Sequence, residues 1–260
     1  MIGSVSMNIR DFIKNNIVYL DGGMGTLLQK SGLQPGELPE RWNISHPEVI
    51  KEIHKSYYDS GSNIVNTNTF GANSLKFGTD ELSEIIYHAV KNADEARKAS
   101  SGKQEKFIAL DVGPTGKLLK PLGDLDFEDA VKAFAEVISL GVKYGVDLIT
   151  IETMNDSYET KAAVLAAKEN SDLPIIVTNA YGENGRLMTG ADPAVGKLAN
   201  FFDIFGRCTA AAADNSYSVC NGKLNVLCKF FCINVVVCHL AVAFRQTGIR
   251  FESNGNGAVF

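Results

Sequence analysis

Apolar runs of the strand type alternate with stretches of helical periodicity between residue 17 and about residue 180. Each run is mostly apolar and ends on a polar residue, as parallel strands do when their carboxyl ends open on a site. We therefore predict parallel strands with polar side chains at one edge of a sheet. The runs cover residues 17–21, 63–68, 107–111, 147–152 and 174–179, and they end on Asp21, Asn68, Asp111, Glu152 and Asn179.

The segments between these runs carry apolar faces at helical spacing and recognisable helix ends. Such a strand–helix repeat predicts an α/β fold, either closed as a (β/α)8 TIM-type barrel or open and doubly wound. We favour the barrel. The end signals are a proline start at Pro47 with a stop at Gly61, an apolar face from Leu82 to Ala93, a cap at Asp126 with Gly145 past the helix end, and a capping-box pattern at Asp156 and Glu159.

The pattern changes after about residue 195. Residues 201–260 hold all 5 cysteines, an alanine run at 210–213 and an apolar segment at 224–244, without clean strand–helix alternation. The chain after Asn179 is barely long enough for three further strand–helix units. We expect residues 1–195 to form the barrel region and residues 196–260 to be a divergent segment, from a truncated or frame-shifted end. The barrel would then be incomplete or aberrant after about residue 195.

The apolar segment at 224–244 approaches the ~20 residues that a membrane span requires. Lys229, Asn234 and His239 interrupt it, and a lysine near the bilayer centre costs ~2.5–3.5 kcal/mol. We therefore favour a buried strand or helix over a membrane span.

Composition narrows the class of protein. A chain of 260 residues with 45% hydrophobic residues suits one α/β barrel, which typically takes about 250 residues. The net charge of -5 argues against nucleic acid as a partner. No secretory signal is visible at the amino terminus, so we expect a cytoplasmic protein. An odd number of cysteines in a reducing compartment does not indicate a disulfide framework.

A glycine-rich turn follows the first predicted strand, in Leu20-Asp21-Gly22-Gly23-Met24-Gly25-Thr26. Its glycines let the backbone approach a ligand and expose N–H groups. Neither a Walker lysine nor dinucleotide-binding spacing is present, and the acid beside the turn would repel a phosphate. The turn suits a zwitterion, with the ammonium on Asp21 and the carboxylate on backbone N–H groups. A purely structural turn is the alternative.

Four ordered motifs give the chain a resemblance to the homocysteine S-methyltransferase family. They are residues 20–26, Asn66-Thr67-Asn68-Thr69-Phe70-Gly71-Ala72, Asp111-Val112-Gly113-Pro114-Thr115-Gly116 and Ile151-Glu152-Thr153-Met154. The likeness covers roughly residues 10–195, and residues 111–130 most resemble the amino-terminal homocysteine-binding module of cobalamin-dependent methionine synthase. It implies a TIM barrel that binds homocysteine at the carboxyl ends of its strands and methylates the thiol to give methionine.

The resemblance also implies roles for single residues. Asp21 and Glu152 would hold the substrate amino group, which offers three donors to the two acids. The alternative for Asp21 and for Glu152 is that the side chain only caps the helix that follows its strand. The substrate carboxylate would contact the backbone at Gly22 and Gly23 together with Thr67 and Asn68. The apolar part of the substrate would contact Phe70 and Met154.

Zinc is the cofactor that the resemblance implies. A free thiol has a pKa of about 8.5, and zinc held by three cysteines would bind and deprotonate the substrate sulfur. The family takes these ligands from a Gly-x-Asn-Cys strand end and a Gly-Gly-Cys-Cys-Gly-Thr motif, and neither occurs here. Cys228 and Cys232 could share a helix face and bind a soft metal, although buried apolar cysteines are favoured. No metal ligand is assigned among Cys208, Cys220, Cys228, Cys232 and Cys238.

The methyl donor implied is methylcobalamin carried by another module, with cobalamin- and folate-binding modules as partners. A stand-alone enzyme that uses a methylsulfonium or a betaine stays open. An inactive truncated fragment that keeps part of the amino-acid pocket without zinc is the main alternative. A barrel hydrolase is a further class, and it would need Asp21 and Glu152 to be ~5–9.5 Å apart.

Overall fold

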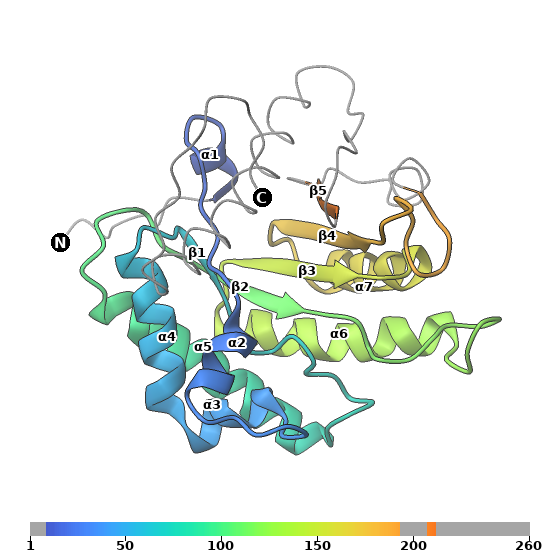
Figure 1. Ribbon diagram of the computed structural model, residues 1–260, viewed down its shortest axis with the longest axis horizontal. Coiled ribbons are helices and arrows are strands. Elements are labelled where there is room, and N and C mark those ends of the chain that lie inside the picture. The colour runs from blue at the N-terminus through green and yellow to red at the C-terminus, as the bar shows by residue number, and fades with distance from the viewer. Residues whose placement is uncertain (1–8, 193–206, 212–260) are drawn as a thin grey trace.

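The computed structural model describes residues 9–192 and 207–211. One parallel sheet contains the described strands in chain order, and a single bridge between Leu20 and Ile64 adds the preceding segment to its edge. The sheet curls into a half-barrel (Figure 1). Its strands are β1 (Ile64–Asn66), β2 (Phe107–Val112), β3 (Leu148–Met154), β4 (Ile175–Tyr181) and β5 (Arg207–Ala211).

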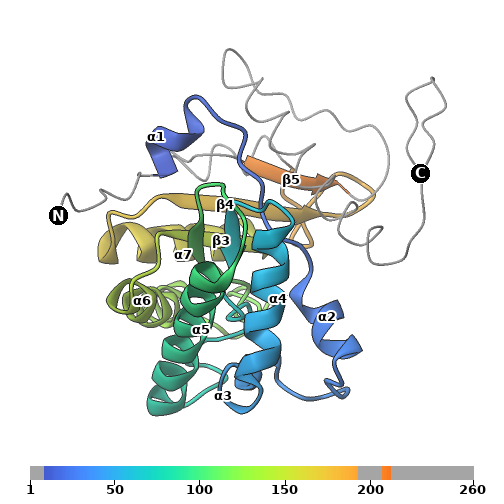
Figure 2. The same cartoon turned by 90° about the vertical axis from the view of Figure 1, so that its left-hand side faces the viewer.

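The long helices α4, α5, α6 and α7 lie together on one side of this sheet (Figure 2). A doubly wound sheet would carry helices on both faces and reverse its strand order at a switch point. Among the described residues, the four long helices share one face, only the short α1 lies on the other, and the strand order does not reverse. The prediction of an incomplete TIM-type barrel is therefore confirmed. The helices are α1 (Ile9–Ile13), α2 (Met24–Lys30), the 3-10 helix η1 (Pro39–Arg41), α3 (Trp42–Ser45), α4 (Pro47–Asp59), α5 (Thr79–Ala99), α6 (Phe127–Tyr144) and α7 (Ser157–Asn170).

Side chains alternate between the two faces of the sheet. The helix-facing set is buried in the main core and includes Val65, Ile108, Leu110, Ile149, Ile151 and Val177. The opposite set along β2 reads Phe107, Ala109 and Asp111, and along β3 it reads Leu148, Thr150 and Glu152. Because strand side chains alternate with period two, this inner face changes from apolar at the amino ends to polar at the carboxyl ends. TIM barrels carry their sites at that carboxyl edge.

Helix α1 covers the amino end of the inner face. Its Ile9 and Ile13 are buried in a second apolar cluster with Leu20, Ile64, Phe107, Ala109, Leu148 and Ile176. Arg10 donates a hydrogen bond to the carbonyl oxygen of Asp172 at 3.2 Å. Both views place α1 on the opposite side of the sheet from α5 and α6 (Figures 1 and 2). The amino end of the half-barrel is therefore closed, and the polar carboxyl end is not covered by α1.

Several strand boundaries differ from the prediction. The run at 17–21 forms only the bridge at Leu20, and the run at 63–68 leaves the sheet after Asn66. Strands β3 and β4 continue to Met154 and Tyr181. Strand β5 was missed, because its alanine-rich sequence lacks strand propensity and only its pairing with β4 defines it. The apolar segment at 224–244 lies outside the described residues.

The helix ends follow the local signals more closely. Asp126 and Gly145 flank α6, and Gly145 has the left-handed φ of 93° that favours glycine. The Asp126 side chain makes no capping hydrogen bond and instead accepts from Lys120 Nζ at 2.8 Å. Asp156 caps α7 by accepting a hydrogen bond from the N–H of Tyr158. The capping-box prediction is wrong for Glu159, because its carboxylate accepts from the N–H of Thr115 at 2.8 Å. Glu159 thus ties α7 to the loop after β2.

Candidate functional site

Asn66, the last residue of β1, joins two acids at the carboxyl edge of the sheet. Its main-chain N–H donates to Asp21 Oδ2 at 2.8 Å. Its side-chain Nδ2 donates to Asp21 Oδ1 at 3.1 Å and lies 3.4 Å from Glu152 Oε2. The structure therefore brings Asp21 and Glu152 together from two different strand ends, through a residue that was not predicted. Their role in substrate binding stays a prediction.

Asp111 adds a third carboxyl group from the end of β2. Its side chain is 7% exposed, and its Oδ1 has no hydrogen-bond partner within the described part of the chain. Burial first, and then the charge of Glu152, raises the pKa of Asp111 well above its usual value. Burial likewise raises the pKa of Asp21, although the bonds from Asn66 oppose this. Because their pKa values are raised, Asp21 and Asp111 are stabilised either by protonation or by a cation bound beside them.

A bulge in β3 sets the position of Glu152. The register of β3 against β4 shifts between Ile151 and Met154. Thr153 within this bulge has a φ of 55°, which is rare for a β-branched residue. Its N–H donates to Thr178 Oγ1 at 2.8 Å. Backbone strain held in place by the neighbouring strand therefore follows directly after one of the two acids.

The same bulge corrects one predicted contact. Without it, Met154 would point to the inner face like Glu152, two residues earlier. With the extra residue, Met154 turns outward and is fully buried in the main core. The prediction that Met154 lines the pocket is therefore wrong. Phe70 is 44% exposed, and the N–H of Gly113 donates to its carbonyl oxygen at 2.9 Å.

The glycine turn packs tightly against α4. A Cβ atom on Gly22 would lie 2.9 Å from the hydroxyl oxygen of Tyr57, so a larger residue would displace the ring. The Tyr57 hydroxyl donates to the carbonyl oxygen of Gly23 at 3.3 Å. The N–H groups of Gly22 and Gly23 donate no hydrogen bond to other described residues. They remain available to an anionic group beside Asp21.

Thr67 and Asn68 are engaged within the protein. The Thr67 hydroxyl lies 2.7 Å from Thr69 Oγ1 and accepts from the N–H of Asp111 at 3.1 Å. Asn68 Nδ2 donates to the carbonyl oxygen of Pro39 at 2.8 Å. Both side chains anchor the loop after β1, so contact with a substrate carboxylate would require an exchange of these bonds.

No group of three or more metal-ligating side chains occurs among the described residues. All 5 cysteines lie at position 208 or later, and only Cys208 falls within the described part, in β5. Its main chain is paired with Thr178. The described residues therefore do not fit the three-cysteine zinc site that the resemblance implies. Over the same residues, we find no helix with the length and apolar character needed to cross a membrane.

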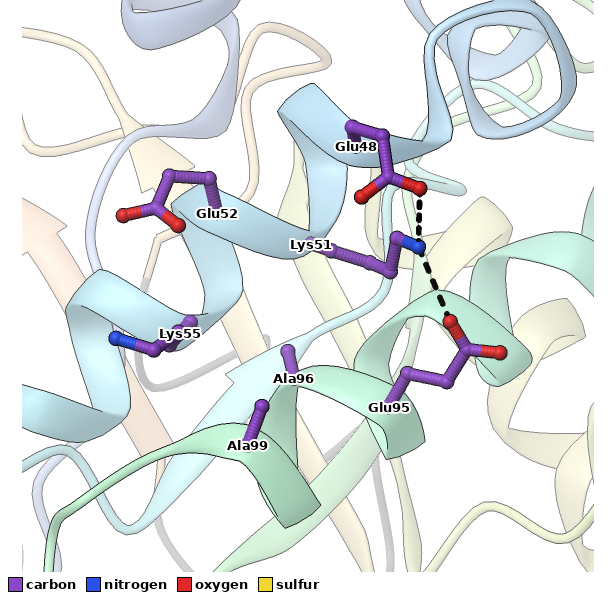
Figure 3. Close-up of a pocket in the computed structure, with 7 residues that line it drawn as sticks. All are labelled: Glu48, Lys51, Glu52, Lys55, Glu95, Ala96 and Ala99. Atoms are coloured by element: carbon purple, nitrogen blue, oxygen red, sulfur yellow. Dashed lines mark hydrogen bonds and ion pairs between the residues drawn. The ribbon is translucent and has the colours of Figure 1, made fainter.

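A separate cavity of about 250 Å³ lies between α4 and α5, on the helical side of the molecule (Figure 3). Lys51 projects between two acids there, with its Nζ 2.5 Å from Glu48 and 3.2 Å from Glu95. Lys55, which also lines the cavity, pairs instead with Asp59. Surface pairs of this kind contribute ~0–1 kcal/mol. The cavity shares no residue with the acidic strand ends, and we assign it no function.

The parallel half-barrel defines an α/β protein of the TIM-barrel type, with Asp21, Asp111 and Glu152 at the carboxyl edge of its sheet. The homocysteine S-methyltransferase family model matches residues 18–207. The chain therefore belongs to the homocysteine S-methyltransferase family. The match extends into the first residue of β5, beyond the point near residue 195 where the resemblance of the motifs ends.

Crystal structures of the homocysteine methyltransferase MmuM from Escherichia coli share the fold. The oxidized form has a TM-score of 0.67 at 19% identity, covering 77% of this chain and 76% of that chain. The metallated form has a TM-score of 0.65 at 19% identity, covering 77% of each chain. The apo form has a TM-score of 0.63 at 20% identity, covering 77% and 74%.

Proposed function

We propose that this chain binds homocysteine at the carboxyl end of the half-barrel and transfers a methyl group to its sulfur, giving methionine. The observation that carries the proposal is the meeting of Asp21 and Glu152 on the side chain of Asn66. Membership of the homocysteine S-methyltransferase family supports the choice of substrate.

The substrate ammonium would lie against Asp21 and Glu152. A cation there would offset the repulsion between the buried Asp21 and the partly buried Glu152 and stabilise their charged forms. The substrate carboxylate would accept hydrogen bonds from the N–H groups of Gly22 and Gly23, with Thr67 and Asn68 contributing after exchange of their internal bonds. The charged end would then be fixed, and the thiol would remain for the reaction.

Methyl transfer requires the sulfur in its thiolate form, whereas a free thiol has a pKa of about 8.5. In the family, zinc supplies this ionisation when it is bound. Since the described residues contain no suitable ligand group, we derive no step through zinc. Asp21, Glu152 and the glycine turn bind and orient the amino acid, which reduces the entropic part of the barrier.

The methyl donor in this proposal is methylcobalamin, carried by a cobalamin-binding module of a cytoplasmic methionine synthase-type enzyme that also includes a folate-binding module. A small donor such as a methylsulfonium or a betaine would make the chain a stand-alone enzyme instead. Assaying methionine formation with each donor separates these two forms of the proposal.

The second candidate is a fragment that binds homocysteine but does not methylate it. It is favoured by the positions of the cysteines, since none precedes residue 208 and the described residues lack a metal-binding group. Stoichiometric zinc together with methionine formation would support the enzyme. Homocysteine binding without zinc or turnover would support the fragment.

Calorimetric titration of the full chain with L-homocysteine tests the binding site directly. We expect Asp21→Asn and Glu152→Gln each to weaken binding roughly 10- to 100-fold, because each removes a charged hydrogen-bond acceptor worth ~1.5–3 kcal/mol. The control is Asp124→Asn, at an exposed position, which should leave affinity unchanged. Equal affinity in all four proteins would show that the acids are structural.

A further inference from the structure

The side chain of Asn66 is held in one orientation by its acidic neighbours. Its Nδ2 lies 3.1 Å from Asp21 Oδ1 and 3.4 Å from Glu152 Oε2. A primary amide nitrogen carries two hydrogens, so each acid can receive one. The flipped amide would place Oδ1 against two carboxylates, which electrostatic repulsion disfavours.

The remaining polar atom of this side chain has no such neighbour. Asn66 Oδ1 is buried and has no hydrogen-bond partner within the described residues. A buried amide oxygen without a donor is unfavourable, and so a ligand N–H group that reached it would be stabilised. The atom belongs to the same side chain that joins Asp21 to Glu152, which places the unused acceptor at the site proposed for the substrate ammonium.

We propose that Asn66 positions Asp21 and Glu152 for the substrate ammonium and presents Oδ1 as its third acceptor. This inference rests on the proposed function. The amide hydrogens hold two acids of like charge side by side in the unliganded protein. An ammonium has three N–H donors, and two carboxylates with one amide oxygen supply an acceptor for each.

The matched control lies at the other end of the same strand. Asn63, directly before β1, accepts from the N–H of Tyr19 at 3.0 Å and donates to the carbonyl oxygen of Glu105 at 2.9 Å. Its bonds are all to main-chain atoms, at the amino edge of the sheet. Asn63→Ala therefore removes an asparagine of purely structural role, and Asn66→Ala removes the proposed clamp.

Competition calorimetry on the full chain compares L-homocysteine with 4-sulfanylbutanoate, which lacks the amino group. We expect Asn66→Ala to weaken L-homocysteine binding roughly 10- to 100-fold and to change 4-sulfanylbutanoate binding less than about threefold. Asn63→Ala should lower stability without changing the ratio of the two affinities. An unchanged ratio in Asn66→Ala would overturn the acceptor role. Asn66→Leu, which is close to asparagine in size and has neither a donor nor an acceptor, gives the same test if the alanine variant does not fold.

Carboxyl titration by 13C NMR without ligand tests the clamp independently. The groups around it are Asp21, Glu152 and Asp111 from strand ends, Glu40 from η1 and Tyr57 from α4. Loss of the Nδ2 donors should raise the carboxyl pKa of Asp21 in Asn66→Ala and leave it unchanged in Asn63→Ala. No rise in Asn66→Ala would overturn the clamp. A wild-type chain that binds neither ligand would refute the proposed function and the acceptor role, while this titration would still decide the clamp.

Discussion

Asp111 is a buried acid at the carboxyl edge whose Oδ1 has no hydrogen-bond partner within the described residues. Its pKa is raised by burial and by the charge of Glu152, so folding favours its protonated form. Below pH 4, which is about the pKa of an aspartate in the unfolded chain, the group is protonated in both states and its full contribution to stability is present. That contribution is lost as the pH rises through the higher pKa of the folded protein. Ionisation of Asp111 should therefore lower the free energy of unfolding of the wild-type protein as the pH rises toward neutral and alkaline values.

We expect Asp111→Asn to remove that loss. The free energy of unfolding of the variant should exceed that of the wild type by at least about 1 kcal/mol at pH 8, and the difference should shrink toward pH 4. Urea unfolding at a series of pH values measures this. Asp124→Asn, at an exposed position, should show no such trend. A variant that is less stable at pH 8 would mean that the carboxylate has a stabilising partner.

Single residues of the site differed in how far the sequence could predict them. Asp21 and Glu152 stand in recognisable motifs at strand ends, and their convergence followed from a parallel sheet. Asn66 was in a motif too, but its role depends on hydrogen bonds to residues 45 and 86 positions away. Thr67 was expected at the substrate, whereas its hydroxyl bonds to Thr69 and Asp111. Which of several suitable partners a polar side chain bonds to is determined by the tertiary structure.

Strand β3 contains the most strained element of the site. Thr153 has a φ of 55°, and a left-handed backbone costs an ordinary L-residue roughly 1–2 kcal/mol. Asparagine tolerates this conformation better, so Thr153→Asn should raise the free energy of unfolding by about 1 kcal/mol. Since the register shift itself is kept by pairing with β4, homocysteine affinity should change less than about twofold.

Urea unfolding and calorimetry on the same sample measure both effects. Thr79→Asn is a suitable control, because Thr79 is exposed and lacks a positive φ. A loss of stability in Thr153→Asn would show that threonine packing, and not backbone strain, dominates at this bulge.

Elements were predictable where their signals are local. Helix α6 ends before Gly145, whose left-handed φ favours glycine, and α7 begins after Asp156, whose side chain caps it. Both signals are encoded in a few neighbouring residues. Strand β5 and the extra residue in β3 are defined by pairing with β4. Hydrophobic runs do not encode register, and so the bulge that turned Met154 away from the site could not be read from the sequence.

At the scale of the whole molecule, the two ends of the half-barrel differ in composition, one being apolar and the other polar. The amino end is closed by α1 and an apolar cluster, and the carboxyl end carries the acids and the glycine turn. Sequence order and parallel pairing were sufficient to predict this polarity, because every strand–helix unit repeats it.

This separation predicts that stability and ligand binding can be changed independently. Ile13 is 7% exposed within the amino-end cluster, so Ile13→Ala should reduce the free energy of unfolding by roughly 2–5 kcal/mol. Homocysteine affinity, measured by calorimetry below the unfolding transition, should stay within about twofold of wild type. Leu122→Ala, at a position 63% exposed, should change neither quantity. A tenfold loss of affinity in Ile13→Ala would mean that α1 acts on the site across the sheet, and that the two ends of the half-barrel are coupled.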